Sequence, residues 1–160
     1  MIDIVISIKP KFVDLIKDGQ KNYEFRKYIP KKGVDKLWIY TSSPICSLEY
    51  VVDIDSIITY PKHILEKGIG NDDFNKGLKQ SRHAYHIKHL YRLKTPLKLE
   101  RLRNEFGFTA PQSYFYLENN QKLSEILLTQ ELERIFKKIR DEKLIFFISY
   151  FCVNVLFPYE

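Results

Sequence analysis

Residues 19–26 of the chain read Gly-Gln-Lys-Asn-Tyr-Glu-Phe-Arg, and this stretch decides how the sequence around it is interpreted. Gly19 stands where the C-terminal cap of a helix belongs, and Pro10 is placed to begin that helix. The side chains that follow alternate, so that aromatic residues face one way and Asn22, Glu24 and Arg26 face the other. The stretch therefore predicts a strand with an aromatic core face and a charged second face.

The charged residues of this stretch are spaced so that they can interact. Glu24 and Arg26 lie two positions apart on one face of the strand, close enough to pair, and Lys21 can turn toward them from the strand's start. A carboxylate between two cations stays ionised and becomes an oriented hydrogen-bond acceptor. It can accept from the exocyclic amine of a base, while the cations meet a phosphate or a carbonyl oxygen. The alternative is an ion pair that only fixes the mouth of the fold.

Strands and short helices alternate on both sides of this stretch. Apolar and alternating runs predict strands, and proline and glycine positions predict helices after Pro10, after Pro61, near 72–79 and near 99–105. The imperfect alternation of one run, 83–93, indicates a bulge. The expected strands are 3–8, 21–27, 36–41, 48–58, 83–93 and 114–117. This order predicts an α+β fold, a small and mostly antiparallel β-barrel with inserted helices.

The last part of the chain has a different pattern. Apolar residues from Leu123 to Ile139 outline one long amphipathic helix that ends near Lys143. The apolar run that follows, from Leu144 to Phe157, cannot stay exposed without aggregating. We therefore expect a barrel domain over residues 1–118 and a helical C-terminal extension over 119–160 that packs on it. A homodimer interface formed by the extension is the alternative.

The pattern of residues 19–26, G-x-K-x-x-E-x-R, resembles the signature of the ASCH family, which belongs to the PUA-like superfamily of barrels. Three flanking segments, 7–10, 39–44 and 111–113, also look like ASCH proteins, so the resemblance runs from about residue 4 to residue 117. It implies a PUA-like barrel with a cleft around the motif that binds RNA or a modified nucleobase. The expected cleft residues are Lys9, Lys21, Glu24 and Arg26, with Ser42, Ser43, Gln112 and Ser113 at the rim.

The resemblance also implies a second hypothesis, an enzyme. Some small ASCH proteins are amidohydrolases of N4-acetylcytidine that use a lysine, a threonine and a glutamate, and another is a ribonuclease. Lys21 matches the family's lysine, whereas Glu24 stands where those amidohydrolases carry their threonine nucleophile, and Tyr50 stands where a glycine is expected. The enzyme hypothesis is a hydrolase of a modified nucleoside or of RNA, with Lys21 and Glu24 as its catalytic pair. A protein that meets a protein partner through its extension is a third hypothesis.

Composition and charge fit a nucleic-acid partner without requiring one. The chain has 160 residues, 44% of them hydrophobic and 29% charged, which excludes a disordered chain and a disulfide scaffold. Its net charge is +6, and the excess of basic residues lies in two segments, 21–36 and 79–103. Basic segments with interleaved aromatic residues favour contact with phosphates and bases. The alternative is that these lysines only solvate strand edges.

No metal or organic cofactor is expected. His83, His86 and His89 would share one face of a helix, but on a strand His86 faces away from the other two. No aspartate, glutamate or cysteine lies within that segment to complete a set of metal ligands. The six glycines are too dispersed for a phosphate-binding loop.

The chain also predicts a cytoplasmic protein with no membrane association. Its first residues contain an early acid and no basic segment, unlike a signal peptide. The longest apolar run, Leu144 to Pro158, is too short and too polar to span a bilayer. Cys46 and Cys152 are far apart in apolar surroundings, as expected for buried thiols in a reducing compartment.

Overall fold

A computed structural model of the chain describes residues 1–135. Within this part, seven strands form one mixed sheet in the order β2-β5-β4-β3-β1-β6, and β7 pairs with β5. Strands β1 and β3 are parallel, and the other pairs are antiparallel. The strands are β1 (Asp3–Ile8), β2 (Tyr23–Arg26), β3 (Lys36–Thr41), β4 (Ser47–Thr59), β5 (His83–Lys98), β6 (Phe115–Tyr116) and β7 (Leu132–Ile135).

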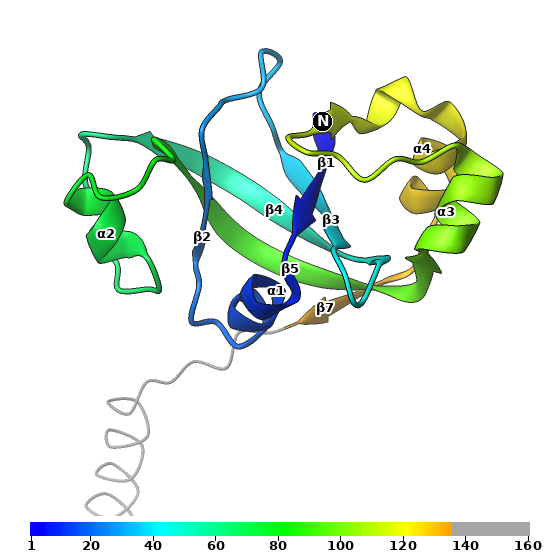
Figure 1. The fold of residues 1–160 in the computed structure, drawn as a ribbon, viewed down its shortest axis with the longest axis horizontal. Helices are drawn as coiled ribbons and strands as arrows, with labels where there is room; N and C mark the ends of the chain where they lie inside the picture. The colour runs from blue at the N-terminus through cyan, green and yellow to red at the C-terminus, as the bar shows by residue number, and fades with distance from the viewer. Residues whose placement is uncertain (136–160) are drawn as a thin grey trace, which may run out of the picture.

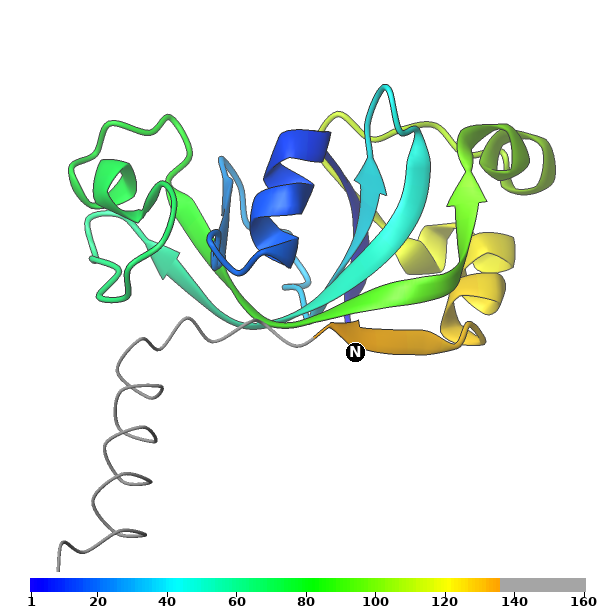
Figure 2. The same cartoon turned by 90° about the horizontal axis from the view of Figure 1, so that it is seen from below.

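The sheet curls into a half-barrel, because the two longest strands, β4 and β5, bend together beneath the first helix (Figure 2). This α+β arrangement of a curled sheet with several helices is the predicted fold class in outline. The helices are α1 (Pro10–Lys17), α2 (Asn71–Asn75), α3 (Leu99–Phe106) and α4 (Gln121–Leu128), with a short 3-10 helix at Leu117–Asn119. Helix α2 lies at one end of the half-barrel, and α3 and α4 lie at the other (Figure 1).

Both faces of β1 and β3 pack against buried side chains, which explains why these two strands are mostly apolar. In β1, Ile4 and Ile6 pack beneath α1 against its buried residues Val13 and Ile16. Val5 points the other way, into a second cluster that includes Trp38 and the buried side chains of α3 and α4. Helix α1 therefore closes the concave face, and its C-terminal end leads directly into β2.

The expected helix after Pro61 is absent from the structure. Residues 61–70 form turns and irregular backbone instead. The side chain of Asn75 bonds both backbone groups of Ile64, accepting from its N–H at 2.8 Å and donating to its carbonyl oxygen at 2.8 Å. These bonds satisfy the backbone locally, so this segment needs no helical hydrogen bonds.

The single long helix expected from Leu123 onward is also wrong. Helix α4 ends at Leu128, and residues 132–135 form β7 against β5. The backbone N–H of Lys94 also bonds the carbonyl oxygen of Glu131, at 3.1 Å. Pairing with the open edge of β5 thus outweighs the local helical periodicity.

The rest of the expected extension, residues 136–160, lies outside the described residues. The proposed boundary at residue 118 and the homodimer therefore stay predictions. Within residues 1–135, no helix is both long and apolar enough to cross a membrane.

Candidate functional site

Lys21, which precedes β2, forms a nearly buried ion triad with Glu24 and Arg26 of β2. The Nζ of Lys21 lies 2.8 Å from Oε2 of Glu24, and Nη2 of Arg26 lies 3.0 Å from Oε1 of the same carboxylate. The three side chains are only 6%, 10% and 15% exposed, respectively. Both carboxylate oxygens therefore already have a cationic partner within the protein.

The turn between α1 and β2 places this triad. Gly19 has φ 72°, a left-handed conformation that glycine adopts without strain, directly after the end of α1. The backbone N–H groups of Gln20 and Lys21 then both bond the carbonyl oxygen of Leu15, each at 2.9 Å. The chain is thereby turned so that Glu24 pairs with Tyr85 of β5 and faces the concave side of the sheet.

Arg26 also links the triad to the opposite wall of the half-barrel. Its Nη2 donates to the carbonyl oxygen of Ser7 at 3.2 Å, and the hydroxyl of Ser7 donates to the carbonyl oxygen of Pro111 at 2.8 Å. The hydroxyl of Tyr28 donates to the carbonyl oxygen of Ser113 at 2.7 Å. The loop before β6 is therefore held beside the motif by two hydrogen bonds.

A cavity of about 160 Å³ opens beside the triad. Its polar lining consists of Lys21, Glu24 and Lys79. The two ammonium groups lie close to one ring, because the Nζ atoms of Lys21 and Lys79 are 4.8 Å and 4.6 Å from the centroid of Phe25. The remaining lining residues are Phe12, Phe25, Ile69 and Gly70. This mixture of apolar walls and convergent charges is typical of a site for a small polar ring.

Burial and neighbouring charges perturb the titratable groups of the site. The pKa of Lys21 is lowered, chiefly by burial and also by the nearby charges of Lys79 and Arg26, although Glu24 opposes this shift. The pKa of Tyr28 is raised, mainly because burial disfavours the phenolate. A buried lysine of this kind gives up its proton more readily than an exposed one.

The structure brings some of the residues expected in the cleft together and leaves others apart. Lys21 and Glu24 line the cavity, and Arg26 completes the triad behind them. The exposed Gln112 and Ser113 belong to the loop that Tyr28 holds. Lys9 does not line the cavity and is exposed at the start of α1. Ser42 and Ser43, which follow β3, do not line it either, and neither does the buried Tyr50.

Besides Phe25 on β2, four of the residues that line the cavity were not among those expected in the cleft. Phe12 projects from α1, and Ile69, Gly70 and Lys79 come from the segment between β4 and β5. Lys79 belongs to the basic segment 79–103. The glycines at 68 and 70 permit a close approach to other parts of the chain, but they do not indicate which part is approached.

The other basic residues of 79–103 do not gather around the cavity. Lys94 pairs with Glu131 and Arg101 pairs with Glu105, whereas Lys88 lines a separate open hollow. Of the basic residues in 79–103, only Lys79 lines this cavity.

The histidines lie in an arrangement that strict strand alternation did not predict. The Nδ1 of His86 is 2.7 Å from a carboxylate oxygen of Asp55, and the Nδ1 of His89 is 3.0 Å from one of Asp53. The register between β4 and β5 shifts on both sides of Ile54, so His86 does not face away from His89 as expected. Among residues 1–135, no three histidine, cysteine or acidic side chains are arranged to hold a metal ion.

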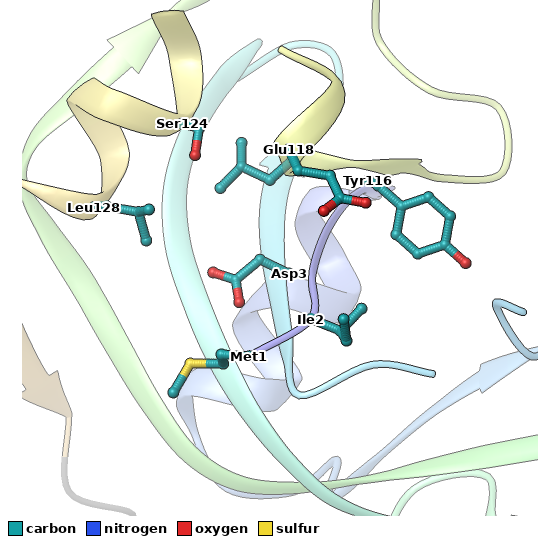
Figure 3. A pocket seen from close by; sticks show the side chains of 8 residues that line it. Met1, Ile2, Asp3, Tyr116, Glu118, Ser124 and Leu128 are labelled. Atoms are coloured by element: carbon teal, nitrogen blue, oxygen red, sulfur yellow. The ribbon is translucent and has the colours of Figure 1, made fainter. Parts of the chain in front are cut away.

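Another cavity, of about 200 Å³, lies beside the N-terminus between β1 and α4 (Figure 3). Its lining includes Met1, Asp3, Glu118 and Leu128 but no residue of the motif. Both of its carboxylates already have partners, because Asp3 accepts from the indole N–H of Trp38 at 2.8 Å and Glu118 pairs with Lys32. The cavity beside the triad is the stronger candidate for a functional site, because Lys21, Glu24 and Phe25 of the motif-bearing stretch line it.

Comparison with known proteins points to the same motif-bearing region. The family model described as "ASCH domain" matches residues 6–96, which is more than half of the chain. A curated relative, the ASCH domain-containing ribonuclease of Zymomonas mobilis, is 25% identical, with the match covering 82% of this chain and 95% of the relative.

Solved structures of an ASCH protein from Zymomonas mobilis share the fold. The crystal structure of that protein matches with a TM-score of 0.59 and 22% sequence identity, covering 81% of this chain and 96% of the other. A single-substitution variant of it matches with the same TM-score and covers 99% of its chain.

Proposed function

The chain belongs to the ASCH domain family, and on this premise we propose that it binds RNA by seating one unstacked base in the cavity beside Lys21 and Glu24. The observation that carries the proposal is the juxtaposition of a buried ion triad and apolar walls around a small cavity. Proteins that recognise RNA by sequence favour bases that leave the stack, because their edges and faces become accessible.

The size and chemistry of the cavity fit one base. A cavity of about 150 Å³ holds one benzene-sized ring, and this one measures about 160 Å³. Phe12 and Ile69 offer apolar contact to the ring, while Glu24 accepts from an exocyclic amine and Lys21 donates to a ring carbonyl. Because Lys21 and Arg26 hold the Glu24 carboxylate in one orientation, it is preorganised to read the edge of a base.

Binding of short labelled single-stranded RNA, followed by fluorescence anisotropy across a salt series, tests the proposal. Phe12→Ala removes one wall of the cavity and is expected to weaken binding about tenfold, since contact between a base and an aromatic ring contributes about 1–3 kcal/mol. Ile45→Ala is the matched control, because Ile45 is similarly exposed and does not line the cavity. If both variants bind as tightly as the wild type, RNA is held by a diffuse basic surface instead.

Glu24→Gln tests whether the carboxylate reads the base. The substitution keeps the shape of the side chain but replaces one acceptor oxygen by an amide donor. It should weaken binding of the preferred homopolymer more than that of the others. An equal loss for all four homopolymers would show that Glu24 does not read the base.

Cleavage of RNA is a second candidate function, favoured by the curated relative, which is named as a ribonuclease and is matched over 82% of this chain. Burial lowers the pKa of Lys21, and Glu24 lies 2.8 Å away, so the two are placed to exchange a proton with a bound strand. If the protein cleaves RNA, Lys21→Met should abolish turnover while circular dichroism shows an intact fold. Glu24→Gln provides a second, isosteric variant, and turnover that persists in both would exclude this pair as catalytic.

A further inference from the structure

We infer that the ligand of this cavity carries a phosphate group beside its base, and that Lys79 binds this phosphate. The ligand is then a nucleotide unit and not a free nucleoside. This inference rests on the proposed function, which places a base in the cavity. It adds the chemical class of the ligand and a residue that selects it.

The charges around the cavity are not balanced. Lys21, Arg26 and Lys79 surround a single carboxylate, that of Glu24, and no other acidic side chain lines the cavity. The charge of Glu24 is already balanced by Lys21 and Arg26, one at each carboxylate oxygen. Among residues 1–135, Lys79 makes no ion pair, and its described partner is the ring of Phe25. One ammonium group at the cavity is therefore available for an anion.

A glycine beside Lys79 leaves room for its ammonium group at the cavity. Gly70 has φ 87°, and a Cβ at this position would lie 3.0 Å from both the Nζ of Lys79 and a ring carbon of Phe25. A Cβ there would require Lys79 and Phe25 to shift by a few tenths of an ångström. The segment itself is fixed to the start of β2, because the backbone N–H of Ile69 bonds the carbonyl oxygen of Gln20 at 2.8 Å. The Lys79 ammonium therefore fits against Gly70 and the Phe25 ring at the edge of the cavity.

Lys21 and Lys79 differ in burial and pairing, so we assign them different roles. Lys21 is buried and paired, so its charge mainly orients Glu24. Lys79 is half-buried at the same ring and lowers the pKa of Lys21 through its own charge. A phosphate group bound at Lys79 would neutralise this repulsion, whereas a neutral nucleoside would leave it in place.

The test compares the four ribonucleosides with their 5′- and 3′-monophosphates, titrated into the full chain and followed by NMR chemical shifts. At least one monophosphate should bind about tenfold more tightly than its nucleoside, as expected for one charge-assisted contact. Lys79→Gln should remove this preference. Lys76→Gln should keep it, because Lys76 is exposed nearby and does not line the cavity.

The same titration separates the possible outcomes. Equal binding of nucleosides and monophosphates, or a preference that survives Lys79→Gln, would overturn the inference while leaving the base site intact. Absence of any shift at the cavity with nucleosides, nucleotides and short RNA would instead overturn the proposed function. A dinucleotide that binds more tightly than either monophosphate identifies an internal phosphate of RNA, whereas equal binding identifies a free nucleotide. Inorganic phosphate alone should bind weakly, because it lacks the base.

Discussion

Arg26 donates to the carbonyl oxygen of Ser7 across 3.2 Å, and this contact joins β2 to β1 on the concave side of the sheet. The same guanidinium group holds Glu24 at 3.0 Å. One motif residue therefore both orients the carboxylate of the site and connects two strands that do not pair with each other. Substitutions in the motif change stability as well as binding, so each needs a stability measurement beside it.

Arg26→Ala should lower the free energy of unfolding by about 3 kcal/mol, because it leaves the nearly buried Glu24 with one cation fewer. Urea denaturation measures the effect. Arg101→Ala is the control, since Arg101 and Glu105 form an exposed pair on α3 whose loss costs at most about 0.5 kcal/mol. Equal losses in the two variants would show that the triad contributes nothing beyond a surface ion pair.

Gly70→Ala should weaken both the fold and RNA binding. An added Cβ meets Lys79 and Phe25 at 3.0 Å, in addition to the cost of about 1 kcal/mol for a positive φ. Gly33→Ala is a matched control, because Gly33 has a similar φ of 82° and nothing within 4 Å of the added atom. Thermal unfolding should show that both variants lose stability from the positive φ. Anisotropy should show that only Gly70→Ala loses RNA binding. RNA binding by Gly70→Ala at the wild-type level would contradict the placement of Lys79.

Leu127→Ala should destabilise the protein by about 2–5 kcal/mol, because Leu127 is buried in the cluster that contains Trp38. Leu128→Ala should change stability by less than about 0.5 kcal/mol, since Leu128 is 63% exposed. Urea denaturation of both variants tests whether α4 is part of the folding unit of the barrel. A small effect of Leu127→Ala would support a separate unit beyond residue 118.

The hydrogen bonds to Asp53 should make the stability of the protein depend on pH in the acid range. Burial alone would raise the pKa of this carboxyl, but hydrogen bonds from Lys36 and His89 outweigh burial and bring the pKa below its usual 3.8. A carboxylate whose pKa is lowered by folding stabilises the protein above the unfolded pKa, and this stability is lost as the pH falls through the folded pKa. Wild type should therefore unfold at a higher temperature than Asp53→Asn at pH 7, and the difference should shrink below about pH 4. A difference that is constant from pH 7 to pH 2 would contradict this cause.

The triad was predictable from the sequence because its members lie within six residues, two of them on β2 and one just before it. The period of two places Glu24 and Arg26 on one face, and the capping glycine places Lys21 at the strand's start. Strand β1 and helix α1 were equally readable, since Ile and Val runs and a proline at the first helical position act locally.

The rest of the site depends on contacts between distant segments. Lys79 and Ile69 reach the cavity only because the segment between β4 and β5 folds back on the start of β2, which no local pattern records. The side of the sheet on which His86 lies depends on bulges, and the sequence does not show where these bulges occur. Strand β7 forms because β5 offers it an open edge, a tertiary effect that overrides helical periodicity.

Strands β4 and β5 pair from Ser47 to Thr59 of β4, with register shifts at the bulges, and the last pair in β4 is Thr59 with His83. The segment that these two residues enclose contributes one wall of the cavity and takes no place in the sheet. Changes in this segment can therefore alter a wall of the cavity while the strand order stays the same, although the segment also bonds the start of β2 through Ile69. Two proteins with the same eight-residue signature can admit different ligands, and the signature alone does not predict what either one binds.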